Sequence, residues 1–282
     1  MKKTDYTENL SQLCLSVMVD VISCIGKYRK DFVLVGGLVP KVLFTKESKH
    51  IGTYDVDFAV NSQNVSEQEY ATIADLLFKR GYHYRKDRDG NDLKFSFERI
   101  IELEEKVHVV VVDLIGPEYG TKAKKGFREK IQEGVHVHKA RGVDIVFDNA
   151  VEINVTAMLP DGILHSEMVK VANGAAYLVL KLITFESRKS EKDAYDIYSC
   201  LKFYPGGIEA LAQDFQPILQ HGLAKEAITY MEKFFSDLLQ IGPQRFARFM
   251  SEDAMERKVY ASELNRLVKI FLERINQDGG GK

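Results

Sequence analysis

The sequence DFVLVGG occupies residues 31–37 and joins a short apolar run, rich in β-branched residues, to a pair of glycines. Such a run, stopped by glycine, predicts a buried strand that ends in a tight turn. We expect a helix over residues 38–44, because proline at position 40 is tolerated only in a first helical turn. Main-chain N–H groups around Gly36 and Gly37 could then approach an anion closely. A double glycine alone is more often a plain turn, so this phosphate loop needs further support.

Two acidic residues follow in the sequence TYDVD, residues 53–57, at the start of a strand predicted over residues 54–60. Strand side chains alternate, so Asp55 and Asp57 project from one face. Their Cα atoms would lie roughly 7 Å apart, at about 3.3 Å per residue. An isolated Asp-x-Asp is more often a solvated strand edge.

A third acid, Asp113, ends a strand predicted over residues 108–114. The run Val109–Val112 predicts that this strand is buried on both faces. Asp55, Asp57 and Asp113 together could bind Mg²⁺ (or Mn²⁺) and support in-line displacement at phosphorus. We expect their carboxyl groups to converge to within about 4–8 Å of one another, the reach of two bridged ions.

Hydrophobic periodicity divides the chain into two parts. The remaining pattern predicts helices over residues 6–28 and 66–81, strands over 94–99, 151–155 and 163–171, and helices from Gly174 onward. Ser66 and Glu69 have the spacing of a capping box. We therefore expect an α/β (α+β) domain, residues 1–172, with a mixed sheet and flanking helices. An all-helical C-terminal domain, residues 173–282, would follow, with a disordered tail from about residue 278.

Composition restricts the class of protein. The 282 residues carry a formal net charge of −2, which gives no global electrostatic case for nucleic acid. The densest local basic stretch is residues 122–130, which is either an RNA-contacting patch or a solvated helix or loop. Three widely spaced cysteines and the lack of a long apolar run indicate a cytoplasmic protein outside the membrane.

A second block of charged residues lies in the helical half, where residues 181–198 read KLITFESRKSEKDAYDIY. Lys181 lies beside an apolar helical stripe and either extends to solvent or neutralises a triphosphate. Arg188 is a phosphate fork or a helix C-terminal charge. Ser190 and Asp193 have capping-box spacing, which accounts for Asp193.

Asp196 has no such capping role. We expect it to pair with Lys181, Arg188 or Lys192 and to organise a site, with Asp193 as the second choice.

The order of these motifs resembles the nucleotidyltransferase superfamily, and most closely its AbiEii/AbiGii-type family of toxins, which includes the MenT-like toxins. The resemblance spans roughly residues 30–200 and departs at Gly37, where many polymerase-β-like enzymes carry serine. It implies that Gly36, Gly37, Thr53, Lys181 and Arg188 bind an NTP substrate. It also implies that Lys181 and Asp196 line the same cleft as the glycine pair.

The resemblance further implies catalysis by Asp55, Asp57, Asp113, Lys181 and Asp196, with Mg²⁺ on the first three. The acceptor would be an RNA, such as a tRNA 3′ end, and the partner a cognate antitoxin protein. Two alternatives remain open. One is a small-molecule nucleotidyltransferase of the aminoglycoside type, and the other a non-catalytic member of the fold that binds a nucleotide or a partner.

Overall fold

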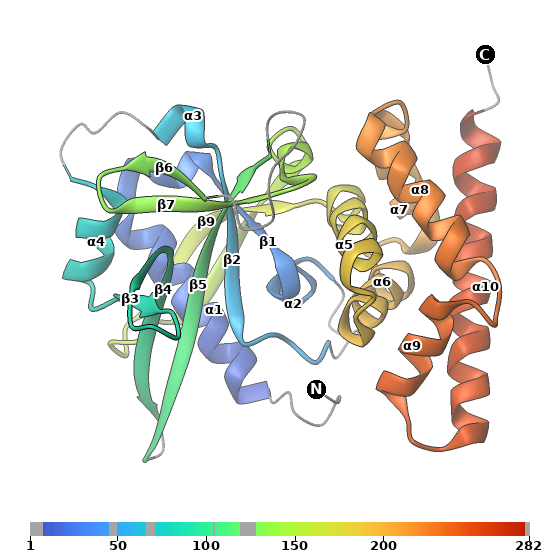
Figure 1. Cartoon of the computed structure of the whole chain (residues 1–282), viewed down its shortest axis with the longest axis horizontal. Coiled ribbons are helices and arrows are strands. Elements are labelled where there is room, and N and C mark those ends of the chain that lie inside the picture. Colours follow the sequence, from blue (N-terminus) through green and yellow to red (C-terminus); the bar gives the residue numbers. More distant parts are fainter. Residues whose placement is uncertain (1–7, 45–49, 66–70, 104, 119–127, 280–282) are drawn as a thin grey trace. The chain divides into compact units, whose positions relative to one another are not determined.

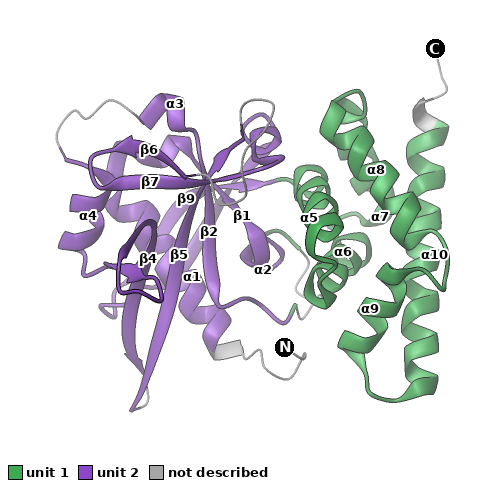
Figure 2. Cartoon of the chain, viewed as in Figure 1, with its two compact units in different colours: residues 1–5, 43–50, 173–282 green, residues 6–42, 51–172 purple. Residues whose placement is uncertain are grey.

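A computed structural model describes residues 8–44, 50–65, 71–103, 105–118 and 128–279. The fold is of the α/β class, with a mixed sheet, flanking helices and a helical C-terminal region. The chain forms two compact units, a sheet unit of residues 6–42 and 51–172 and a helical unit of residues 1–5, 43–50 and 173–282 (Figure 2). Each unit is described by itself.

Within the described residues, nine strands and several short helices make up the sheet unit (Figure 1). The helical elements are α1 (Glu8–Cys24), η2 (Gly26–Asp31), η3 (Gly36–Leu38), α2 (Val39–Leu43), α3 (Ser62–Val65), α4 (Ile73–Lys79) and η5 (Val143–Val146). The strands are β1 (Phe32–Val35), β2 (Asp55–Val60), β3 (His83–Lys86), β4 (Asp92–Leu103), β5 (Lys106–Pro117), β6 (Arg128–Gln132), β7 (Val135–Ala140), β8 (Ala150–Met158) and β9 (Leu164–Ala172).

The strand order is β3-β4-β5-β2-β1-β9-β8, and β7 joins β5 and β6 beside this path. The central strand pair, β2 and β5, is parallel, as are β1 with β9 and β5 with β7. The strands predicted around residues 31–35, 54–60, 94–99, 108–114, 151–155 and 163–171 are all present. The pattern gave no prediction for β3 or β6, which are short and carry mostly charged or exposed side chains.

One face of this sheet is covered by α1, which crosses behind β2 and β5 in Figure 1 and also packs on β8 and β9. The other face is more open along β5. Val110 and Val112 are fully buried, whereas Val107 and Val109 are 65% and 45% exposed. The prediction that Val109–Val112 is buried on both faces is therefore wrong. An unbroken valine run fitted either arrangement, because valine tolerates a half-exposed strand face.

The helix predicted over residues 66–81 also needs correction. Residues 66–70, which include the expected capping pair Ser66 and Glu69, lie outside the described residues. The described helix α4 begins after Thr72, which forms a capping box with Asp75, and it ends before Gly81, which has a φ of +87°. The end of the helix thus agrees with the predicted range, and the positive φ of Gly81 explains why the helix stops there.

The helical unit contains the rest of the described chain. Its elements are α5 (Gly174–Arg188), α6 (Glu191–Phe203), α7 (Gly207–Phe215), η6 (Gln216–Ile218), α8 (Gly222–Phe235), α9 (Ile241–Met250) and α10 (Ala254–Gly279). The helix α10 continues to Gly279, so Asp278 and Gly279 belong to it rather than to the predicted tail.

The chain passes from the sheet unit to the helical unit at residue 173, but an earlier segment also belongs to the helices. The Phe44 ring lies edge-on to the rings of Tyr177 and Tyr204, with centroids 5.7 and 6.3 Å away. Aromatic burial of this kind stabilises a helical core. It explains why residues 43–50 group with helices that begin more than 120 residues later.

Candidate functional site

The glycine pair after β1 forms a turn whose shape depends on the absence of side chains. Gly36 has a φ of +73°, and a Cβ built on it would lie 1.9 Å from Oδ2 of Asp57. A Cβ on Gly37 would lie 2.8 Å from Oγ1 of Thr53. The turn and the Asp-x-Asp strand therefore touch directly. The helix after the turn, α2, has only five residues, so a phosphate bound here would depend on the N–H groups of the turn itself.

The three acids lie on one face of the sheet. In the register of the parallel strands β2 and β5, Asp57 is paired with Asp113 and Asp55 with Val111. Paired residues on neighbouring strands share a face, and Asp55 shares the face of Asp57 because strand side chains alternate. All three are partly accessible, whereas Val56, Val112 and Leu114 of the opposite face are fully buried. The three carboxylates therefore share one face of the sheet, as a metal site formed by them requires.

Hydroxyl groups donate hydrogen bonds to two of these three carboxylates. Thr53 Oγ donates a hydrogen bond to Oδ1 of Asp55, and Ser96 Oγ on β4 donates to Oδ1 of Asp113. Ser96 did not emerge from the sequence, because the complete burial that marks it as needing a polar partner is visible only in the structure.

The side chains fit Mg²⁺ in chemistry, since carboxylate oxygens are its preferred protein ligands. As they lie, however, no three His, Cys, Asp or Glu residues in the described ranges are gathered closely enough to hold an ion. Asp55, Asp57 and Asp113 thus share one face of the sheet, as a metal site requires, but they do not form a closed ligand set. Their convergence to within about 4–8 Å stays a prediction.

The local charge is concentrated on this face. Burial raises the pKa of Asp113 above its ordinary value; the Ser96 hydrogen bond opposes that rise and the Asp55 carboxylate adds to it. Behind the acids, burial and the charges of Asp55 and Asp57 raise the pKa of the Cys14 thiol to about 12. A cation at this face would relieve the repulsion between these carboxylates.

Replacing Asp113 with asparagine is expected to stabilise the metal-free protein. Because the pKa of Asp113 is raised in the folded state, its ionisation costs folding free energy, and that cost appears as the pH rises from the unfolded pKa to the folded pKa. At pH 7 and in EDTA, Asp113→Asn should therefore raise Tm by about 2 °C. Mg²⁺ should raise the Tm of the wild type but not of the variant. A lower Tm for the variant in EDTA would contradict this account.

Substitution of Gly36 by alanine is expected to displace Asp57. Alanine at a positive φ costs about 1–2 kcal/mol, and here its Cβ would also collide with the carboxylate. Gly162 is a matched control, because it has a φ of +84° and no atom within 4 Å of a built Cβ. In denaturant unfolding, Gly36→Ala should lose about 1 kcal/mol more than Gly162→Ala, as expected for one forced shift of a packed group. Equal losses would show that the contact with Asp57 is unimportant.

The helical unit contains a buried ionic cluster built on α5 and α6. Lys181 Nζ lies 2.6 Å from Oδ2 of Asp196 and 3.5 Å from Oδ1 of Asp193. The Arg188 guanidinium donates two hydrogen bonds to Asp193, of 2.6 and 2.8 Å. Lys192 Nζ binds Asp196 from one turn away. Both carboxylates are 0% exposed and Lys181 is 8% exposed.

His50 completes this cluster. Its Nε2 lies 2.9 Å from Oδ1 of Asp196, and its ring centroid lies 5.1 Å from that of Tyr195. Burial and the charge of Lys192 lower the pKa of His50 to about 4, so the ring is neutral at pH 7. No sequence pattern indicated this contact, because His50 and Asp196 are 146 residues apart.

The cluster confirms one prediction and corrects another. Asp196 pairs with Lys181 and Lys192, two of the three partners expected for it, and both hold its pKa well below the ordinary value despite its burial. The prediction that Asp193 caps α6 is wrong. Ser190 is the N-cap residue but makes no side-chain capping bond, and Asp193 instead binds Arg188 and Lys181. The ion pairs with two nearby cations, rather than the capping-box spacing, determine the position of the Asp193 side chain.

One predicted feature, the basic stretch of residues 122–130, lies partly outside the described residues. Lys122, Lys124 and Lys125 of the basic stretch lie outside the described residues, whereas Arg128 and Lys130 belong to β6. Among the helices that the structure does describe, none has the length and apolar content needed to cross a bilayer. Cys14, Cys24 and Cys200 are free thiols.

Comparison with known proteins identifies no relative, so a function for this chain has to be argued from the site itself. Neither the models of known protein families nor the sequences of curated proteins match this chain.

Proposed function

We propose that the protein is a Mg²⁺-dependent nucleotidyltransferase, which moves an NMP from an NTP to an acceptor hydroxyl. One observation carries the proposal. Asp55, Asp57 and Asp113 share the open face of one sheet, and Asp57 touches the Gly36 turn. A glycine turn that can admit a phosphate beside three carboxylates that can hold a cation is the minimum equipment for phosphoryl chemistry.

In this reaction the acceptor oxygen attacks the α-phosphorus, the bond to the β-phosphate oxygen breaks, and pyrophosphate leaves. Gly36 and Gly37 would hold the phosphates through main-chain N–H groups. Asp55 and Asp57 would hold Mg²⁺, which when bound neutralises the charge that develops on the phosphate oxygens. Asp113, whose raised pKa favours proton acceptance, would be a metal ligand or would take the acceptor's proton.

Thr53 and Ser96 would have a preparatory role. Each donates a hydrogen bond to one of the carboxylates and so orients it before an ion arrives. Binding would require Asp55 and Asp113 to turn their Oδ1 atoms from these hydroxyls toward the ion, which costs two hydrogen bonds of about 1 kcal/mol each.

The resemblance implies that Lys181 and Arg188 bind the triphosphate, and we include this in the proposal. Both already face carboxylates in the helical unit, so Asp196 and Asp193 would act as positioning residues for the two cations. A cation held by buried carboxylates is preorganised and loses little side-chain entropy when it meets a phosphate.

The resemblance also implies an RNA acceptor, such as a tRNA 3′ end, and an antitoxin protein as partner. The direct test is incubation of the purified protein with Mg²⁺, each of four α-labelled NTPs and total RNA, with a parallel reaction lacking RNA. We expect labelled RNA and free pyrophosphate. Label on a small molecule or a protein, with none on RNA, would keep the reaction and discard the acceptor. Absence of any transfer with Mg²⁺ or Mn²⁺ would leave a non-catalytic member of the fold.

A further inference from the structure

Beyond Asp113, the open face of the sheet continues into a row of basic side chains on β6 and β7. Ile115, two residues after Asp113, is paired with His138 on β7. In the antiparallel pair of β6 and β7, Arg128 is opposite His138 and Lys130 is opposite His136. These four residues therefore share the face of Asp113. Val135 and Val137, which alternate with the histidines, are fully buried on the other face.

The electrostatics of the sheet unit agree with this register. His138 and the exposed Arg85 of β3 both lie close enough to the Asp113 carboxyl to act on it electrostatically. On the same ladder, partial burial lowers the pKa of His136, and the nearby charges of Lys94, Arg128 and Lys130 lower it further. Basic side chains thus lie both beside Asp113 and along the ladder of β6 and β7.

Arg128 is held in place by an aromatic ring. Its guanidinium carbon lies 4.8 Å from the centroid of Phe95, and the ring of His138 lies 5.5 Å from the same centroid. A stacked guanidinium keeps its hydrogen-bond donors free to point sideways at a phosphate. Lys130 pairs with Glu133 in an exposed salt bridge, which is worth little and is easily exchanged for a phosphate.

We propose that this surface, Arg85, Lys94, Arg128, Lys130, His136 and His138, binds the sugar-phosphate backbone of an RNA acceptor. The identity of the acceptor rests on the proposed function, whereas the surface rests on the register and charges above. The cations Arg85, Lys94, Arg128 and Lys130 are distributed over β3, β4 and β6 rather than gathered at one point, which suits successive phosphates of a strand. The carboxylates that would bind a metal and the cations that would bind phosphates lie on one face of the sheet. An RNA bound to these cations would therefore have its acceptor end near Asp113.

The test measures binding without chemistry. A fluorescein-labelled RNA with a single-stranded 3′ end is titrated with the protein in EDTA, without NTP, and its anisotropy is followed at several salt concentrations. We expect Arg128→Glu/Lys130→Glu to raise Kd at least about tenfold and to reduce the slope of log K against log salt by about 1.4, or about 0.7 for each phosphate of a single strand that the protein no longer neutralises. Arg128→Gln/Lys130→Gln, which should fold readily, should give the same slope change.

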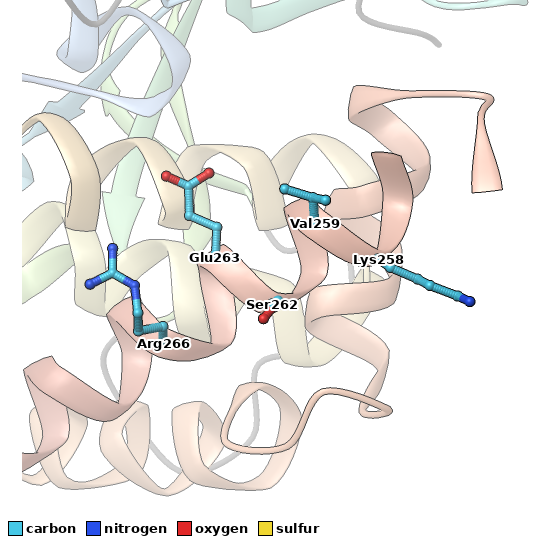
Figure 3. A pocket seen from close by; sticks show the side chains of 5 residues that line it. All are labelled: Lys258, Val259, Ser262, Glu263 and Arg266. Atoms are coloured by element: carbon cyan, nitrogen blue, oxygen red, sulfur yellow. The ribbon is translucent and has the colours of Figure 1, made fainter. Parts of the chain in front are cut away.

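The control removes the same charge elsewhere. The shallow pocket along α10 is lined by Lys258, Val259, Ser262, Glu263 and Arg266, and it presents exposed cations from a single helix (Figure 3). Lys258→Glu/Arg266→Glu should leave Kd within about twofold, because these charges belong to the helical unit and not to the proposed surface. Equal losses in the two double variants, or no loss in either, would overturn the assigned surface. Tighter binding of polyglutamate than of RNA would also overturn the assigned surface, because it would indicate an acidic protein partner.

Failure of the surface and failure of the proposed function are distinguishable. Asp57→Asn should bind RNA like the wild type, since it leaves the side chains of the proposed surface unchanged. If the protein binds RNA at this surface but transfers no nucleotide, the proposed enzymatic function is wrong and the proposed RNA-binding surface stands. If nucleotide transfer to RNA is unaffected by Arg128→Glu/Lys130→Glu, the proposed RNA-binding surface is wrong and the proposed enzymatic function stands.

Discussion

Replacing Asp57 with asparagine should lower the rate of nucleotide transfer by a factor on the order of 10³, the several kcal/mol that a catalytic ion supplies. Asp57 is the acid that joins the two halves of the site, because it is paired with Asp113 across the sheet and touches the Gly36 turn. Asparagine keeps the size and one oxygen of the side chain but removes the charge that holds an ion. Initial rates at saturating NTP over a range of Mg²⁺ and Mn²⁺ concentrations measure this effect.

The control is Asp92→Asn, which removes an exposed carboxylate at the start of β4, where it pairs with Lys86. Its rate should stay within about twofold of the wild type, because an exposed ion pair contributes little. Both variants should keep the unfolding midpoint of the wild type in EDTA. Equal labelling by wild type and Asp57→Asn would rule out the assigned metal site.

Replacing Asp196 with alanine should be the most damaging change to the fold of the helical unit. Asp196 is fully buried and binds Lys181, Lys192 and His50. Removing one partner from a buried ionic cluster leaves uncompensated charge and typically costs about 3–5 kcal/mol. We expect Asp196→Ala to lower the free energy of unfolding in urea by that amount, in a transition followed by circular dichroism.

The corresponding surface change should be nearly silent. Glu252 pairs with Arg257 at 3.2 Å and is 74% exposed, so Glu252→Ala should cost less than about 1 kcal/mol. Asp196→Asn separates stability from positioning, because the amide keeps an acceptor for Lys181. If Asp196 positions Lys181 for phosphate binding, this variant should raise KM for NTP more than it lowers kcat. A change in kcat alone would contradict the positioning role.

Much of the sheet could be predicted from the sequence, because local patterns determine its strands. The apolar run before Gly36 and the alternation at Asp55 and Asp57 each predict a strand, and a strand period of two fixes which side chains share a face. The pattern could not show which strands are neighbours. Asp57 and Asp113 are more than 50 residues apart in the chain, and their pairing is a property of the sheet order.

The buried polar partners were the least predictable part of the site. Ser96 and His50 each satisfy a carboxylate that is distant in sequence, and no local period marks such a contact. Asp193 shows the opposite error. Its spacing from Ser190 satisfied a local rule, but Lys181 and Arg188 offered it stronger, charge-assisted bonds.

The grouping of residues 43–50 with the helices has a consequence for how the two units can be separated. A fragment that begins at residue 173, where the amino-acid pattern changes, would lack the Phe44 ring that packs on Tyr177 and Tyr204 and the His50 ring that binds Asp196. Because the chain enters the helical unit, leaves it and returns, a single recombination point cannot exchange that unit between genes. The two units are therefore expected to be inherited together.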